Sequence, residues 1–136
     1  MPDNPRLPPV KTAIVLIAHG SRNADANADA TYFAEQLQNS GIAVNVKAAY
    51  LELAEPTIPQ AVESLIKNLP EVVILLPYFL SAGVHVRRDL AELCVRFRND
   101  HPQTVFQLAE PIGRHTLLQT ILLERAREAL LNCPSA

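Results

Sequence analysis

The chain has 136 residues, of which 49% are hydrophobic and 19% are charged, and its formal net charge is −2. This composition excludes extensive disorder and fits one domain with a sizeable core. The charge balance argues against a general affinity for nucleic acid or anionic membranes, and an aromatic content of 5% argues against a base-stacking surface.

Neither a membrane span nor an export signal is evident. The longest uncharged apolar stretch, Val72–Val84, contains a proline and a glycine and is too short to cross a bilayer. Residues 1–11 are rich in proline and lack the apolar segment of a secretory signal, so we expect a flexible tail there. Cys94 and Cys133 have no CxxC spacing and no disulfide framework around them, which favours a reduced, cytoplasmic protein.

The first half of the chain alternates between strand and helix patterns. Residues 12–18 (TAIVLIA) form a run rich in β-branched side chains that predicts a buried strand. Residues 25–39 carry apolar side chains at helical spacing, and residues 42–51 begin with the alternation of a second strand. Residues 57–69 have the cleanest helical face, from Ile58 to Leu69.

The second half repeats the alternation. Residues 72–76 (VVILL) predict a third buried strand, and apolar residues between Val86 and Phe97 mark a third helix. Residues 104–108 predict a fourth strand, and the apolar side chains from Leu118 to Leu130 mark a last helix. The pattern predicts an α/β fold of three layers, with helices covering both faces of a four-stranded, mainly parallel sheet. We expect a single domain over residues 12–133.

Ligands of open parallel sheets bind outside the carboxyl ends of the strands, so polar residues that directly follow strands are the candidates for a site. They are His19, Ser21 and Arg22 after the first strand, Glu52 and Glu55 after the second, Ser81, His85, Arg87 and Arg88 after the third, and Glu110, Arg114 and His115 after the fourth.

These residue types suit metal and proton chemistry. A neutral imidazole binds divalent transition metals, and its pKa of ~6.5 also allows proton transfer near neutral pH. His19 and His85, with a carboxylate such as Glu52, could hold a metal with open coordination positions. The alternatives are that both histidines cap helices or bond loop carbonyls and that Glu52 faces solvent. For Glu55 we expect an acidic cap of the second helix, and for His115 a helix-start residue.

Four arginines fall near the same edge and together favour an anionic ligand, although each alone is compatible with ordinary surface charge. They are Arg22, Arg87, Arg88 and Arg114. The sequence has no GxGxxG, no GxxxxGK[ST] and no GxSxG elbow, so dinucleotide, P-loop and α/β-hydrolase interpretations lack support.

Three segments resemble the short sirohydrochlorin chelatases. They are IVLIAHGSRNADAN (residues 14–27), YLELAEPTIPQAV (50–62) and ILLPYFLSAGVHVRRDL (74–90), with a weaker continuation in EPIGRHTLL (110–118). The resemblance implies a chelatase-like fold, a homodimer, and insertion of Co²⁺ or Fe²⁺, with Ni²⁺ as a further candidate, into sirohydrochlorin. This tetrapyrrole carries eight carboxylates and leads to cobalamin or sirohaem.

The resemblance also implies roles for individual residues. His19 and His85 would hold the metal, and Glu52 would orient a histidine or receive a proton. The substrate-binding residues would be Ser21, Arg22, Ser81, Arg87 and Arg88. The divalent metal would be a substrate, and we expect no organic cofactor, no nucleic acid and no membrane partner.

Other functions stay open at this point. The same edge could belong to a non-catalytic carrier of tetrapyrrole or metal, or to a flavodoxin-like binding module. A histidine phosphatase is a further alternative, because a strand followed by His-Gly resembles the RHG motif of those enzymes. Ala18 stands where that motif has its phosphate-binding arginine, which weakens this alternative.

Overall fold

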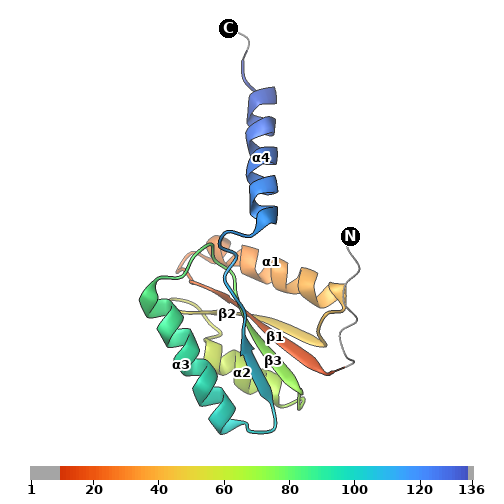
Figure 1. The fold of residues 1–136 in the computed structure, drawn as a ribbon, viewed down its shortest axis with the longest axis vertical. Helices are drawn as coiled ribbons and strands as arrows, with labels where there is room; N and C mark the ends of the chain where they lie inside the picture. The colour runs from red at the N-terminus through yellow and green to blue at the C-terminus, as the bar shows by residue number, and fades with distance from the viewer. Residues whose placement is uncertain (1–9, 135–136) are drawn as a thin grey trace.

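The computed structural model describes residues 10–134, which form four strand–helix repeats (Figure 1). The elements are β1 (Thr12–Ala18), α1 (Ala24–Ser40), β2 (Asn45–Tyr50), α2 (Ile58–Ile66), β3 (Val72–Pro77), α3 (Val84–Asp100), β4 (Val105–Leu108) and α4 (Thr116–Leu131). The strands form one parallel sheet in the order β2-β1-β3-β4. The predicted three-layer α/β class is confirmed, and every strand pair is parallel.

The core lies mainly between the sheet and two helices. Alternate side chains of β1 and β3 point to the face on which α2 and α3 pack, and helix α1 lies on the opposite face over β1 and β2. The fully buried side chains on the α2–α3 side include Val15, Ile17, Val62, Leu75 and Phe106. Their alternation in each strand follows the period-two geometry of β structure.

Two elements are shorter in the structure than predicted. The strand predicted over 42–51 covers only Asn45–Tyr50, and just before it the amide of Val44 donates to the carbonyl of Thr12 (2.9 Å). The helix predicted over 57–69 ends at Ile66. Leu69, expected on its apolar face, lies beyond the helix with φ of 52° and is 79% exposed.

Helix α2 is capped by Thr57, so the expectation that Glu55 caps it was wrong. The Thr57 hydroxyl accepts from the amide of Gln60 (3.3 Å), while the Gln60 side chain accepts from the amide of Thr57 (2.8 Å). This reciprocal capping box satisfies two backbone donors that would otherwise lack partners.

The outer edge of β2 is partly occupied by other groups of the chain. The side-chain amide of Gln38 donates to the carbonyl of Val44 (2.7 Å), and its oxygen accepts from the amide of Val46 (2.7 Å). Further along, the amide of Tyr50 donates to the carbonyl of Pro56 (3.0 Å). These contacts satisfy polar groups that an edge strand otherwise presents to solvent.

The amino-terminal segment predicted as a tail falls mostly outside the described residues. Residues 1–9 lie outside the described residues, whereas Lys11 is described. Its carbonyl accepts from the amides of Glu71 (2.8 Å) and Val72 (3.2 Å), so Lys11 is tied to the start of β3.

Helix α4, unlike the other three helices, covers neither face of the sheet. It leaves the carboxyl end of the sheet and projects away from the other elements (Figure 1). None of its residues is buried, and Leu118 alone is half-buried. The predicted apolar stripe is therefore present but uncovered. No helix within residues 10–134 is long and apolar enough to cross a membrane.

Candidate metal and substrate site

His19 and Glu52 are held together by the backbone beyond the ends of two neighbouring strands. Strands β1 and β2 pair in register to Ala18 and Tyr50. The ladder continues past their ends, because the amide of Leu51 donates to the carbonyl of Ala18 (3.0 Å) and the amide of Glu52 donates to that of His19 (3.1 Å). The expectation that these two residues meet at the carboxyl edge therefore follows from strand pairing.

Gly20 allows this close approach of the two loops. Its φ is +94°, a conformation that L residues rarely adopt. A Cβ atom at this position would overlap the carbonyl oxygen of Glu52. Glycine is therefore required here for two reasons, the backbone conformation and the lack of space.

The imidazole of His19 is exposed and rests against one aromatic ring. Its centroid lies 4.7 Å from that of Phe79, with the two planes inclined by 35°. Phe79 is buried and belongs to the loop between β3 and α3. The ring of His19 therefore contacts the loop after β3, while its backbone carbonyl accepts from the loop after β2.

His19 and Glu52 line one cavity of about 410 Å³ at the carboxyl edge. Asp89 of α3 also lines it, so one histidine and two acidic residues border the same space, although within residues 10–134 they are not close enough together to hold a metal ion as a group. Its remaining lining residues are Tyr50, Leu51, Thr57, Ile58, Pro59, Val86 and Leu93. We call it the His19 cavity. An imidazole with carboxylate oxygens suits divalent metals and proton transfer.

The sequence analysis missed Asp89, because it follows two arginines on an exposed stretch of helix. Its spacing was nevertheless a usable signal, since Val86, Asp89 and Leu93 recur at intervals of three and four on one helical face. Both apolar members of this set also line the His19 cavity.

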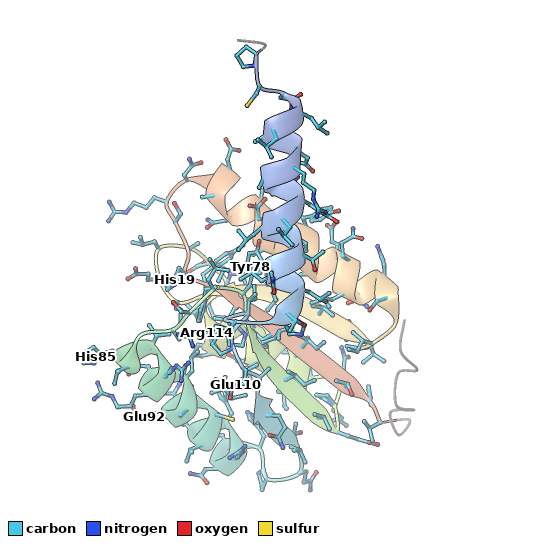
Figure 2. The ribbon with its side chains drawn as sticks, turned by 45° about the horizontal axis from the view of Figure 1, so that its top comes forward. His19, Tyr78, His85, Glu92, Glu110 and Arg114 are labelled. Atoms are coloured by element: carbon cyan, nitrogen blue, oxygen red, sulfur yellow. The ribbon has the colours of Figure 1, made fainter. Side chains whose placement is uncertain are left out.

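His85 does not line the His19 cavity. It lies in the first turn of α3, is exposed, and its Nδ1 is 3.0 Å from Nη2 of Arg88. Figure 2 shows it at the outer end of α3, away from His19. Within residues 10–134, no group of three or more His, Cys, Asp or Glu side chains lies close enough to hold a metal ion.

The arginine contact determines what His85 can offer. A guanidinium is a donor without acceptor capacity, so Nδ1 accepts and the proton of the neutral ring sits on Nε2. A metal at Nε2 needs the opposite tautomer, and a metal at Nδ1 must displace Arg88. In this arrangement neither ring nitrogen of His85 offers a free lone pair to a metal.

Two of the predicted substrate-binding residues line a second cavity. Ser81 and Arg87 border a space of about 530 Å³ together with Glu110, Arg114 and His115. A smaller cavity of about 190 Å³ shares Arg87 and Glu110 with it. The ring of His115 accepts from the amide of Leu117 (3.1 Å), so His115 is the helix-start residue that the sequence predicted.

The other predicted substrate-binding residues lie elsewhere. The Ser21 hydroxyl accepts from the amide of Asn23 (3.0 Å), and its own amide donates to Oδ1 of Asn27 (3.0 Å). Ser21 thus shapes the loop before α1. Arg22 is exposed in that loop and lines neither of these cavities, and Arg88 is the partner of His85.

Glu55 faces a different cavity from Glu52. It lines a space of about 370 Å³ together with Glu35 and Lys47, beside the edge strand β2. Of the two candidate carboxylates after β2, only Glu52 lines the His19 cavity.

Tyr78, on the side of the sheet that carries α1, has a raised pKa. Burial raises the pKa of Tyr78 above its ordinary value of 10.0, and the charge of Asp29 raises it further. Its ring centroid lies 5.3 Å from that of Phe33 of α1. The phenol is therefore neutral throughout the physiological pH range.

These features define a parallel α/β protein with a donor-lined cavity at the carboxyl edge of its sheet, a position typical of ligand sites in such folds. The family model of CbiX matches residues 13–129. The chain belongs to the CbiX family, which confirms the resemblance seen in its motifs.

Two curated relatives come from Priestia megaterium. The chain is 33% identical to a sirohydrochlorin cobaltochelatase over 96% of its length, and 28% identical to a sirohydrochlorin ferrochelatase over 85%. The chain spans only 44% of the length of each of these relatives.

Solved structures agree with the fold. A CbiX protein of Marinobacter aquaeolei matches with a TM-score of 0.77 and 32% identity, covering 90% of this chain and 99% of that one. The sirohydrochlorin chelatase SirB of Bacillus subtilis subspecies spizizenii, solved in complex with cobalt, matches with a TM-score of 0.78 and 27% identity. That match covers 87% of this chain and 50% of SirB.

Proposed function

We propose that this chain inserts a divalent metal, Co²⁺ or Fe²⁺ with Ni²⁺ as a further candidate, into sirohydrochlorin. The observation that carries the proposal is the His19 cavity, where an imidazole and the carboxylates of Glu52 and Asp89 border one space at the sheet edge. The names of the relatives support the substrate and metals, and the pathway would be cobalamin or sirohaem biosynthesis.

The reaction exchanges one metal ion for two protons. Two pyrrole N–H bonds break, the ring nitrogens bind the metal, and the two protons must leave the centre of the ring. His19 would present a neutral nitrogen to the metal, and Glu52 would accept a proton or orient the metal's water ligands. Asp89 adds a second carboxylate on the facing helix. Because only a few protein ligands would hold the metal, its release to the ring would be favoured.

His85 would assist from the rim of this site. It lies one helical turn before Asp89, so a rotation of its side chain away from Arg88 brings the ring toward the His19 cavity. Once Nδ1 is released from Arg88, the neutral ring could accept a pyrrole proton there and give its Nε2 proton to solvent, so that one proton is taken up and one is released. We propose both metal contact and proton transfer for this residue.

The basic residues would hold the carboxylates of the substrate. Arg87 borders the second cavity with Ser81 and Arg114, and the guanidinium group binds carboxylates through paired hydrogen bonds. Arg22 and Arg88 are exposed near the same edge and would contact peripheral carboxylates, with Ser21 shaping the loop that carries Arg22. We propose no organic cofactor and no nucleic-acid or membrane partner.

We also propose a homodimer in the cytoplasm. The resemblance to the short chelatases implies two copies, and the two Priestia megaterium relatives are about twice as long as this chain. Both cysteines are free thiols, one of them exposed, which fits a reducing compartment.

The decisive experiment follows the absorption of sirohydrochlorin without oxygen in the presence of Co²⁺, Fe²⁺ or Ni²⁺. Replacing His19 with Ala should abolish the rate above spontaneous insertion, and His85→Ala should lower it strongly. His101→Gln is the matched control, because His101 lies at the opposite edge of the sheet, against Phe106. Full activity in both His19→Ala and His85→Ala would reject these roles. Tight tetrapyrrole binding without accelerated insertion would indicate a carrier instead.

A further inference from the structure

The imidazole of His19 is not oriented by a hydrogen bond from the protein. His85 and His115 each have a ring nitrogen in a hydrogen bond, whereas neither ring nitrogen of His19 has such a partner within residues 10–134. A histidine that binds a metal is ordinarily oriented by a hydrogen bond at its second ring nitrogen. If His19 presents a nitrogen to a metal in a fixed direction, another contact must orient its ring.

Phe79 supplies such a contact. The centroids of the two rings are 4.7 Å apart and their planes are inclined by 35°, so the rings are nearer to stacked than to edge-on. Flat rings that met edge to edge would need a larger separation, so Phe79 covers part of one face of the imidazole. The nitrogens of an imidazole bond in the plane of the ring, and contact with its face therefore leaves both of them available.

The ring of Phe79 is itself firmly held. Only 8% of Phe79 is exposed, and it belongs to the core cluster between the sheet and helices α2 and α3. Its loop is bonded on two sides, because the amide of Tyr78 donates to the carbonyl of Ile17 (2.6 Å) and the carbonyl of Phe79 accepts from the amide of Ile112 (3.2 Å). Ile17 lies two residues before His19, so Phe79 is tied to the same end of β1 that carries the histidine.

The backbone of His19 is fixed as well, which leaves only the rotation of its side chain. Its carbonyl accepts from the amide of Glu52 (3.1 Å), in continuation of the pairing between β1 and β2. The bond from Cα to Cβ has three staggered orientations, and the bond to the ring rotates more broadly. An exposed imidazole without a partner exchanges among these orientations within nanoseconds. Contact with the Phe79 ring selects among them.

We propose that Phe79 is a positioning residue for His19, and that its buried ring keeps the imidazole in one orientation at the His19 cavity, ready for the incoming metal. This role rests on the proposed function, in which His19 contacts the metal. A side chain that is already ordered loses less rotational freedom when it binds. Pre-ordering of this kind should tighten the binding of a divalent metal at His19 by about three- to tenfold.

The two histidines assigned to the metal are therefore held in different ways. The ring of His85 is held through Nδ1 by Arg88, and this contact occupies the lone pair of that nitrogen. The ring of His19 is held through its face by Phe79, and this contact occupies neither nitrogen. His19 can thus bind a metal without rearrangement, whereas His85 must first leave Arg88.

The first test measures the orientation of the His19 side chain by NMR, without metal or tetrapyrrole. We expect the three-bond couplings of a single rotamer in the wild type and averaged couplings in Phe79→Leu. Phe97→Leu is the matched control, because Phe97 is a buried member of the same core, 4% exposed, and packs against Phe106 with centroids 5.6 Å apart. This control should keep the single rotamer. Averaged couplings in the wild type, or a single rotamer retained in Phe79→Leu, would overturn the proposal.

The second test uses Co²⁺ alone and follows the paramagnetic broadening of the His19 ring signals during a titration. Phe79→Leu should raise the dissociation constant about three- to tenfold, and Phe97→Leu should leave it unchanged. Phe79→Met fills more of the volume of the lost ring and gives the same comparison if Phe79→Leu does not fold. Equal Co²⁺ affinity in the wild type and in the Phe79 variant, or no broadening at His19 in the wild type, would overturn the proposal.

The third test separates the positioning role from the proposed function. With sirohydrochlorin and Co²⁺, Phe79→Leu should lower kcat about tenfold or more and change the KM for sirohydrochlorin little, because the ring acts on the metal ligand. A raised KM with an unchanged kcat would overturn the proposal. A wild type that binds Co²⁺ at His19 in one orientation but inserts no metal would refute the proposed function and still support the positioning role of Phe79.

Discussion

Nη2 of Arg88 lies 3.0 Å from Nδ1 of His85, one turn apart on the exposed start of α3. Because arginine only donates, this contact assigns the proton of the neutral imidazole to Nε2. We predict this tautomer in ¹⁵N-imidazole spectra of the wild type, and a mixture of both tautomers in Arg88→Ala. Both residues are exposed, so the substitution should change the unfolding free energy by less than about 0.5 kcal/mol. A wild-type His85 protonated at Nδ1 would contradict the assignment.

The two glutamates after β2 should behave differently. Glu52 borders the His19 cavity and Glu55 does not. We expect Glu52→Gln to lower the rate of metal insertion roughly a hundredfold or more, as for loss of a general base. Glu55→Gln, which makes the same change three residues away, should stay close to the wild type. If both variants, measured at saturating tetrapyrrole, lost the insertion rate equally, then lining the His19 cavity would not explain the effect of Glu52.

Gly20 should resist substitution by alanine. Its φ is +94° and an added Cβ would overlap the Glu52 carbonyl, so we expect Gly20→Ala to lower the unfolding free energy by more than about 2 kcal/mol. Gly83→Ala is the control, because its φ is negative and nothing lies within 4 Å of an added Cβ. That change should cost less than about 1 kcal/mol. Urea denaturation of both variants measures the difference, and comparable losses would contradict the argument.

Tyr78 should make stability depend on pH in the alkaline range. Burial, with a contribution from Asp29, raises its pKa above 10.0, so the folded state keeps the phenol proton more tightly than the unfolded state. The resulting stabilisation is fully present below pH ~10 and is lost as the pH rises through the folded-state value. Tyr78→Phe should remove this component of the pH dependence. Tyr32→Phe, at an exposed position, controls for loss of a hydroxyl, and an unchanged alkaline profile in Tyr78→Phe would count against the shift.

Much of the fold could be predicted because short buried strands and amphipathic helices leave different periodicities. The same pattern places the ends of β1 and β2 side by side, and this pairing brings His19 to Glu52. The cap of α2 could also be predicted from the sequence, since Thr57 and Gln60 have the spacing of a capping box. The acidic charge of Glu55, two residues before the cap, is the weaker of the two signals.

Two features cannot be predicted from the hydrophobic periodicity of the sequence. Periodicity marks the stripe from Leu118 to Leu130 as a face that needs covering, but it does not say which surface covers it. The sequence does not predict side-chain rotamers either. It places His85 at the carboxyl edge but does not indicate that its ring contacts Arg88. The fold and one half of the candidate site were therefore predictable, and the orientation of the other half was not.

Gln38 has a consequence for how copies of this chain can associate. Its side chain bonds to the outer edge of β2 at Val44 and Val46, and Pro56 bonds to the amide of Tyr50 further along. A glutamine thus stands in for the peptide group of a neighbouring strand. An additional strand joining the sheet here would first have to break these bonds, which protects the β2 edge against growth into fibrils.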